Sequence, residues 1–172
     1  MDIQIRPETP ADYLAIRAVN EQAFGKPNEA RIVEAVRESP CFIPNLSLVA
    51  ESDGVIVGHV LFSRGKVEGE GGTWELLALG PVAVRPSCQR QGIGSRLIRA
   101  GLERAIELSH RGVFLIGHPT YYPRFGFTSA RAFGLEVPFP VSDEVFMALP
   151  LRAEAFEGVS GIVIYPPAFN EP

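Results

Sequence analysis

The sequence predicts a mixed α/β domain, and three features of the chain support this fold class. Apolar runs of strand length are separated by turn residues. Other segments place their apolar residues at helical spacing. A glycine-containing loop leads directly into one of these helical segments. With 172 residues, of which 46% are hydrophobic, the chain has enough apolar material for the core of one domain.

The N-terminal part is expected to form a strand and two helices. Residues 3–6 have the composition of a strand, after which Thr9 and Pro10 supply a helix cap and a first-turn proline. This helix is expected to continue to about residue 24, and a second one to cover residues 28–38. The residues expected to face the core are Leu14, Ala18, Val19 and Ala23 in the first helix and Ile32, Val33 and Val36 in the second.

A β-meander is expected next. Residues 46–51 and 55–63 are rich in strand-forming residues and flank Asp53-Gly54, a dipeptide typical of hairpin turns. A glycine-rich connection then leads to a longer strand over residues 74–84.

Gly80 and Pro81 interrupt this longer strand, because proline cannot donate a hydrogen bond to a neighbouring strand. We expect a bulge or a splay at this point. Such a distortion leaves backbone N–H groups of Gly80, Val82 or Val84 unpaired and turned toward the space beyond the strand.

The loop that follows has the features of an anion-binding site. Residues 79–95 read LGPVAVRPSCQRQGIGS, so an apolar strand ends and a helix opens just after Gly92. The first N–H groups of a helix have no intrahelical partner and point outward, where they can bind phosphate oxygens. Gly92 and Gly94 keep side chains out of the way, Arg90 adds positive charge, and Ser95 adds a hydroxyl. The spacing fits neither a Walker A loop nor a dinucleotide-binding fingerprint.

The rest of the chain is expected to complete the same domain. A helix over residues 92–110 is followed by strands over 113–117, 135–137, 145–151 and 161–165. The core-facing residues of this helix are expected to be Ile93, Leu97, Ile98, Leu102, Ala105 and Ile106. We expect one domain over residues 1–172, with its core at about 3–151 and a C-terminal strand and tail over 152–172. The final strand can pair within the chain or with a second copy, so a monomer or a homodimer is expected.

Two motifs together resemble the GNAT acetyltransferase superfamily, in particular a group of small bacterial predicted acetyltransferases. The first is Gln89-Arg90-Gln91-Gly92-Ile93-Gly94, which is similar to the family's element for the pyrophosphate of acetyl-coenzyme A. The second is Tyr121-Tyr122-Pro123-Arg124-Phe125-Gly126-Phe127, which comes after one helix and one strand, in the order that the family shows. The resemblance covers about residues 4–151. It implies a mixed, mainly antiparallel central sheet, splayed near Gly80-Pro81 and flanked by helices.

This resemblance also implies the reaction and the coenzyme site. The expected function is direct transfer of an acetyl group from acetyl-CoA to a primary amine, with backbone stabilisation of the tetrahedral intermediate. The first two helices are expected to wall one side of the acceptor site. The residues expected to bind the coenzyme are Val82, Ala83, Val84, Gln89, Arg90, Gln91, Gly92, Ile93, Gly94, Ser95 and Tyr122. A departure from the family pattern lies at residues 118–120, where many members have an asparagine before the tyrosine.

The resemblance also implies candidate catalytic residues, namely a tyrosine of the second motif and a carboxylate on the strand before the splay, where some GNAT members carry a base. A histidine that follows the strand over residues 113–117 is a further candidate. Tyr122 is the candidate general acid, although it can also merely pack beside the coenzyme, and Tyr121 takes its place if the register differs by one. Glu75 and His118 are candidate bases, with an exposed strand glutamate and a turn-capping histidine as the alternatives. The amine can also lose its proton to water. Cys88 could carry the acyl group covalently, but a structural role as a small residue in the turn is the favoured interpretation.

Composition limits the other possibilities. A net charge of −4 and a pI near 5.4 argue against a nucleic-acid partner, and Glu29 and Glu34 favour a cationic acceptor. Two cysteines at wide spacing suggest neither a disulfide framework nor a metal site. The N-terminus lacks signal-peptide features and no apolar run is long enough to span a membrane, so a cytoplasmic protein is expected. The alternative function is a non-catalytic acyl-CoA-binding regulatory or interaction domain. The acceptor and the acyl chain length stay open.

Overall fold

The computed structural model describes residues 2–170, which form one nine-stranded sheet with helices on both of its faces. The ends of the predicted domain, residues 1 and 171–172, lie outside the described residues. The strands are β1 (Gln4–Pro7), β2 (Ser47–Ser52), β3 (Val55–Gly69), β4 (Gly72–Val84), β5 (Gly112–Ile116), β6 (Thr128–Ser129), β7 (Leu135–Glu136), β8 (Phe146–Pro150) and β9 (Gly161–Ile164). The α-helices are α1 (Tyr13–Phe24), α2 (Asn28–Arg37) and α3 (Ile93–Glu107).

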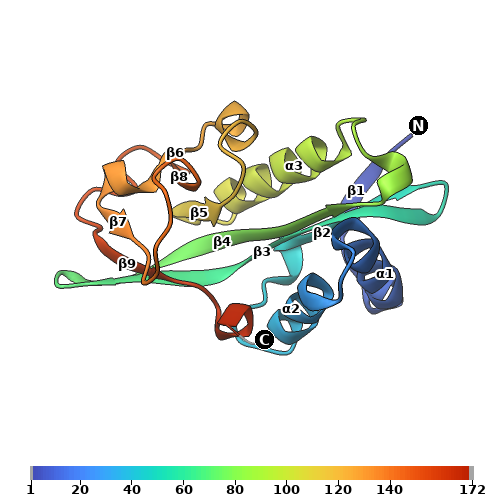
Figure 1. Ribbon diagram of the computed structural model, residues 1–172, viewed down its shortest axis with the longest axis horizontal. Coiled ribbons are helices and arrows are strands. Elements are labelled where there is room, and N and C mark those ends of the chain that lie inside the picture. Colours follow the sequence, from blue (N-terminus) through green and yellow to red (C-terminus); the bar gives the residue numbers. More distant parts are fainter. Residues whose placement is uncertain (1, 171–172) are drawn as a thin grey trace.

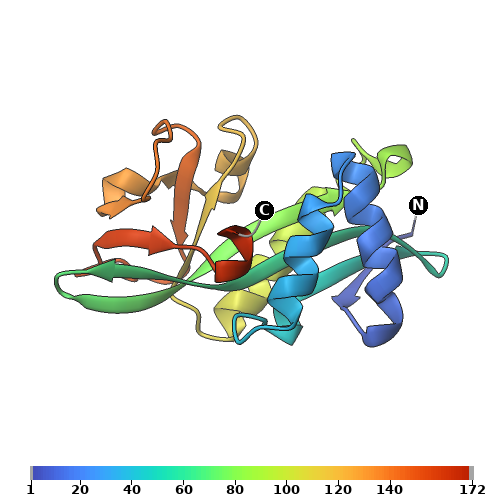
Figure 2. The same ribbon diagram turned by 60° about the horizontal axis from the view of Figure 1, so that its bottom comes forward.

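The sheet is mixed and mainly antiparallel. Its order is β1-β2-β3-β4-β5-β8-β6, while β9 pairs with both β3 and β7. Only the β4–β5 and β7–β9 pairs among the described strands are parallel. Helix α3 covers one face, and α1 and α2 cover the other (Figures 1 and 2). This arrangement confirms the predicted fold class.

Strand β4 changes its pairing at the predicted proline. Val60 lies opposite Val82 whereas Phe62 lies opposite Leu79, so β4 carries a bulge at Gly80-Pro81, where the peptide bond is cis. On the other edge of β4, pairing with β5 is confined to Leu77 and Ala78. The edge of β4 from residue 79 onward therefore faces an opening rather than a strand, as the sequence predicted.

Two apolar residues that periodicity assigned to the core lie outside it. Leu14 is 84% exposed on α1 and Ile106 is 53% exposed on α3. On α1 the buried face is formed instead by Ile16, Val19 and Asn20. Leu14 lies two residues before the buried Ile16 in the same helix, so at 3.6 residues per turn it lies on the side of α1 that faces away from the sheet.

The C-terminal part folds back onto the hairpin end of β3. Residues 66–68 of β3 pair with 162–164 of β9, and the short 3₁₀ helix Pro167–Asn170 follows. The predicted final strand therefore pairs within the chain. The two-residue strand β6, which pairs with β8, was not predicted.

A buried polar cluster lies between β1, α2 and the β2–β3 hairpin. The Glu8 carboxylate accepts two hydrogen bonds from Arg37, at 2.7 and 3.2 Å, and one from the Ser47 hydroxyl. The Ser47 Oγ is also 2.9 Å from His59 Nε2. Burial alone raises the pKa of Glu8, yet hydrogen bonds with His59, Arg37 and Ser47 outweigh this effect and hold the pKa at about 2.

Candidate active site

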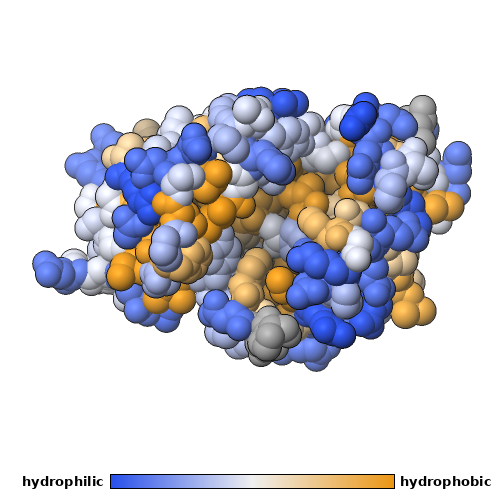
Figure 3. All heavy atoms as spheres, viewed as in Figure 1, coloured by the Kyte–Doolittle hydropathy of each residue, from blue (hydrophilic) through white to orange (hydrophobic). Residues whose placement is uncertain are grey.

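A cleft of about 750 Å³ opens where β5 leaves β4, and we call it the coenzyme cleft. Its walls come from the free edge of β4, from residues 88–95 of the loop and the start of α3, and from the segment around Tyr121 and Tyr122. Ala23 and Phe24, at the end of α1, line it as well. Figure 3 shows hydrophobic residues around a hollow near the middle of this face.

The loop before α3 has the backbone shape of an anion site. Arg90 and Gly92 both adopt left-handed conformations, with φ of 64° and 82°. The bond from Arg96 N to Gly92 O, at 3.0 Å, opens the helical hydrogen-bond pattern, so the amides of residues 93–95 precede it. Together with the Arg90 side chain and the helix dipole, these amides provide positive potential at the mouth of the cleft.

The free edge of β4 offers backbone groups to the same cleft. Arg85 N donates to Val57 O at 2.8 Å, so the backbone of residue 85 faces β3. Because alternate residues of an antiparallel strand face opposite neighbours, the N–H groups of Val82 and Val84 point away from β3 and toward the opening. The Val84 carbonyl already accepts a hydrogen bond from Gln89 Nε2 at 3.0 Å.

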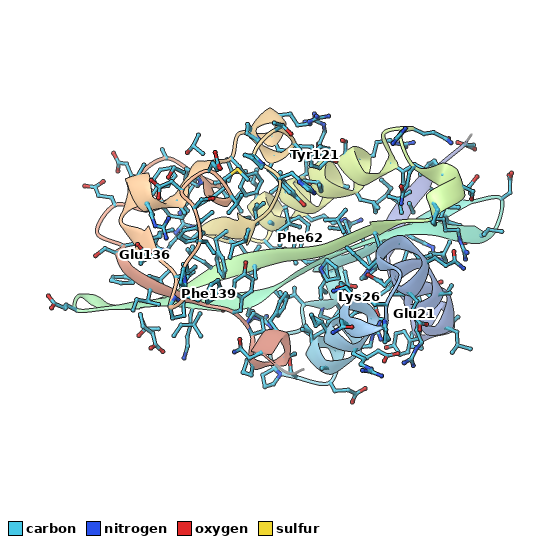
Figure 4. All side chains as sticks on the ribbon, viewed as in Figure 1. Glu21, Lys26, Phe62, Tyr121, Glu136 and Phe139 are labelled. Atoms are coloured by element: carbon cyan, nitrogen blue, oxygen red, sulfur yellow. The ribbon has the colours of Figure 1, made fainter. Side chains whose placement is uncertain are left out.

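The two adjacent tyrosines occupy different places. The Tyr121 hydroxyl lies 2.9 Å from Ser95 Oγ at the start of α3, and the Arg124 guanidinium stacks over the Tyr121 ring (Figure 4). Tyr122 packs edge-on against Tyr121, with ring centroids 5.1 Å apart. Burial raises the pKa of Tyr122 to about 12, so its hydroxyl keeps its proton at neutral pH.

A second cavity of about 600 Å³ adjoins the coenzyme cleft, and we call it the acceptor pocket after the acceptor site expected beside the first two helices. The two share four lining residues, namely Phe24, Val82, His118 and Tyr122. The bulge at Gly80-Pro81, the start of α2 and the C-terminal 3₁₀ helix complete the acceptor pocket. A group bound in one cavity can therefore reach a group bound in the other past Tyr122 and His118.

Most of the predicted site residues surround the coenzyme cleft. Those that line it are Val82, Val84, Gln89, Arg90, Gly92, Ile93, Gly94, Ser95, His118 and Tyr122. Ala83 instead points to the other face of the sheet, where it packs with Ile16 and Val19, and Gln91 is exposed and does not line the cleft. Ala83 is turned away because successive side chains of a strand point to opposite faces, and Gln91 is turned away by the conformation of the loop.

Glu75 is misplaced for the predicted role of base, and the structure corrects this assignment. It lies opposite Lys66 near the hairpin end of β4, away from residues 79–82 and 84, which line the two cavities. Its carboxylate is 3.6 Å from Arg64 Nε and 3.5 Å from His110 Nδ1. Glu75 is therefore an exposed strand residue with basic neighbours.

The loop arginines divide into two groups. Three of them make contacts that stabilise the fold. Arg85 donates hydrogen bonds to Ile56 O and Gln22 Oε1, Arg96 donates to Ile3 O, and Arg99 stacks on Phe125. Arg90 lines the coenzyme cleft. Arg124 also lines it and was not predicted, although it stands within the second motif.

Cys88 has the surroundings of a structural residue. It is 7% exposed and packs in the core cluster beneath α3. Within residues 2–170 there is no group of three or more metal-ligating side chains, and no helix there is long and apolar enough to span a membrane.

Comparison with known proteins agrees with this geometry. Residues 4–130 match the family model described as an acetyltransferase (GNAT) domain. The chain is 41% identical over 135 residues to the uncharacterised N-acetyltransferase YjhQ of Escherichia coli K12, covering 78% of this chain and 75% of YjhQ. It is 34% identical over 167 residues to the uncharacterised N-acetyltransferase YhbS of the same strain, covering 96% and 98%.

Two crystal structures with bound coenzyme have the same fold. Escherichia coli YhbS in complex with CoA superposes with a TM-score of 0.89 at 32% identity, covering 98% of this chain and 92% of YhbS. A GNAT family acetyltransferase from Brucella melitensis in complex with acetyl-CoA superposes with a TM-score of 0.80 at 35% identity, covering 98% of each chain.

Proposed function

The chain belongs to the GNAT acetyltransferase family, and on that premise we propose that it transfers the acetyl group of acetyl-CoA directly to a primary amine. The observation that carries this proposal is the meeting of two cavities at Tyr122 and His118. One cavity opens at the α3 loop and the other at the β4 bulge. Two adjoining cavities suit a reaction in which the enzyme binds both substrates at the same time.

Coenzyme binding is expected to use the loop and the free edge of β4. The amides of residues 93–95 and the Arg90 side chain suit a pyrophosphate, and CoA is the ligand in the YhbS complex. The N–H groups of Val82 and Val84 suit the amides of a pantetheine arm that takes the place of the missing strand. Because the Val84 carbonyl is held by Gln89, we expect Val82 to supply the accessible carbonyl on this edge.

Transfer requires three events at the junction of the two cavities. The amine nitrogen attacks the thioester carbon, and the oxygen becomes an oxyanion that a backbone N–H of the β4 edge stabilises. The intermediate collapses with cleavage of the carbon–sulfur bond, and the Tyr122 hydroxyl donates its proton to the departing sulfur. The pKa of Tyr122 near 12 keeps that proton available at neutral pH.

Removal of the amine proton has two possible routes. His118 lines both cavities and can accept the proton directly or through water. The amine can also enter the pocket already neutral. Glu75 is not part of this proposal, because it lines neither cavity.

The test compares acetyl-CoA binding with acetyl transfer in two variants. Tyr122→Phe is expected to bind CoA with an unchanged Kd in calorimetry but to lose about 10²- to 10⁴-fold in thiol release with an amine. Tyr121→Phe serves as the neighbouring control and is expected to keep most of the transfer rate. The reverse result would assign the acid to Tyr121. CoA binding by wild type without any transfer would identify a non-catalytic acyl-CoA-binding domain instead.

A cytoplasmic location and a monomeric or homodimeric state stay predictions. Cell fractionation tests the first, and light scattering of the purified protein tests the second.

A further inference from the structure

Aromatic side chains from distant parts of the sequence meet around the acceptor pocket. Its lining includes Phe24, Tyr122, Phe139, Tyr165 and Phe169. Phe24 and Phe139 are 38% and 43% exposed, so both rings stay accessible to solvent rather than filling the core. In Figure 4 the labelled Phe139 lies among the C-terminal strands, whereas the labelled Lys26 lies at the α1–α2 junction. Accessible aromatic rings that face one cavity are typical of a binding site for an apolar group.

Packing holds the C-terminal part of this wall in place. Tyr165 stacks edge-on against Phe114 of β5 and contacts Phe169, each at 5.0 Å between ring centroids. Ala168 is 7% exposed and packs in the cluster that includes Val33 of α2. Burial raises the pKa of Tyr165 to about 12, so its hydroxyl is neutral. The pocket is therefore formed before an acceptor binds.

One carboxylate gives this aromatic pocket a charge. Among the described lining residues Glu29 is the only carboxylate, and none is a lysine or arginine. Its side chain is 15% exposed at the first turn of α2. Glu29 Oε1 is shielded from solvent and makes no hydrogen bond with any described residue. Its charge partner is Lys26 Nζ at 3.3 Å, on a side chain that is 56% exposed.

These features restrict the charge of the acceptor. Lys26 does not line the acceptor pocket, and because its side chain is exposed, solvent screens its ammonium group and leaves the Glu29 charge only partly balanced. Inside the pocket the shielded carboxylate still favours a cation and disfavours an anion, and aromatic faces also attract ammonium groups. A polyamine carries several ammonium groups separated by short alkyl segments, and one carboxylate cannot pair with all of them. An ammonium group attached to an aromatic body matches both the single charge and the rings.

We propose that the acceptor pocket selects a small primary amine carried on an aromatic body, and that Glu29 determines this specificity by attracting the ammonium form. The inference rests on the proposed acetyl transfer, whose coenzyme cleft it leaves unchanged. Phe139, Tyr165 and Phe169 lie beyond residue 130, where the match to the family model ends. Selection of the acceptor is thus placed largely in a part of the chain that the family model does not cover.

The experiment measures thiol release at saturating acetyl-CoA with 2-phenylethylamine, spermidine and a lysine-containing peptide. We expect kcat/KM for 2-phenylethylamine to exceed that for spermidine or the peptide by at least about tenfold. Glu29→Gln is expected to raise the KM for 2-phenylethylamine about tenfold with little change in kcat. Glu34→Gln is the matched control on the same helix, because Glu34 lies 3.3 Å from Arg17 and lines neither cavity.

A second variant tests the aromatic wall without touching the charge. Phe139→Ala removes an exposed ring and is expected to raise the same KM while the Kd for CoA stays unchanged. Ile162→Ala, at another exposed apolar residue that lines neither cavity, is the control. Equal behaviour of Phe139→Ala and Ile162→Ala would overturn the aromatic part of the inference.

The outcomes separate this inference from the proposed function. Preference for spermidine or the peptide, or equal KM values for Glu29→Gln and Glu34→Gln, would overturn the inference while acetyl transfer still stands. If no amine is acetylated, the proposed function fails. In that case calorimetry of 2-phenylethylamine with CoA-saturated protein decides the inference, because absence of binding would overturn it too.

Discussion

Replacing Gly92 by aspartate or by asparagine separates charge from shape at the loop before α3. A Cβ at Gly92 would meet no atom within 4 Å, so either side chain fits. The φ of 82° is left-handed, a conformation that asparagine and aspartate adopt more readily than other residues. Both variants should therefore fold with a similar and small loss of stability. They differ in one negative charge beside the expected pyrophosphate.

The size of that charge effect can be worked out. For two unit charges about 6 Å apart in an effective dielectric of about 20, the repulsion is about 3 kcal/mol. Because residue 92 is exposed, solvent and salt reduce this to about 2 kcal/mol, which is roughly a 30-fold change in Kd. Gly92→Asp should therefore bind CoA about 30-fold more weakly than Gly92→Asn at low salt.

Isothermal calorimetry with CoA measures both Kd values, and repeating the titrations in about 1 M salt tests the cause. The difference between the two variants should shrink sharply in salt, because screening acts on charge and not on shape. Equal Kd values for Gly92→Asp and Gly92→Asn at low salt would refute the assignment of this loop to the pyrophosphate. A difference that persists in salt would point to altered loop geometry.

The protonation of Tyr122, the buried carboxylate of Glu8 and the packing of Gly101 can each be tested. Burial raises the pKa of Tyr122 to about 12, so its hydroxyl should stay protonated across the working range. The plot of kcat against pH should therefore rise as the amine loses its proton and show no descending limb below about pH 11. A descending limb near neutrality would exclude Tyr122 as the acid. Hydrogen bonds with His59, Arg37 and Ser47 outweigh burial and lower the folded-state pKa of Glu8 from 4.5 to about 2, so its contribution to stability is present above pH 4.5 and is lost as the pH falls toward 2. Urea unfolding at neutral pH and at about pH 3 should show this loss in wild type. Glu8→Gln should make the loss smaller, and Asp12, whose pKa is also lowered to about 2, should account for part of the remainder. The same variant should cost about 3 kcal/mol at neutral pH, since Arg37 is left unpaired. Gly101→Ala would place a Cβ 2.1 Å from Phe62 Cε1 and should lower the free energy of unfolding by about 1–3 kcal/mol, so an unchanged urea midpoint would contradict the tight packing of α3 on β3.

The coenzyme side of the molecule was predictable because its parts are close in sequence. The β4 edge, the glycine loop and the start of α3 lie within residues 79–95, and each has a local signal in proline, glycine or apolar spacing. Local signals gave the position of the bulge at Gly80-Pro81 and of Gly92 at the helix start. They could not tell which side chains along β4 would reach the opening, and Glu75 was assigned to the site from the family resemblance alone.

The acceptor side was not predictable in the same way. Phe24, Phe139 and Phe169 carry no common motif and come from three separate parts of the chain, and Phe169 reaches the pocket through the pairing of β9 with β3. Nothing in the local sequence of residues 161–164 specifies that partner. Similarly, Leu14 has the apolar character of a core residue, yet α1 packs on the sheet through the face of Ile16 and Val19, which leaves Leu14 exposed.

The pairing of β9 with β3 also governs when the two cavities arise during synthesis. Every residue that lines the coenzyme cleft precedes residue 125, so that cleft's components leave the ribosome first. The acceptor pocket needs Phe139, Tyr165 and Phe169, which are made later and must join a strand laid down long before. Contacts between residues so distant in sequence form slowly, because a long loop must close. A nascent chain can thus contain every residue of the coenzyme cleft before it contains those of the acceptor pocket.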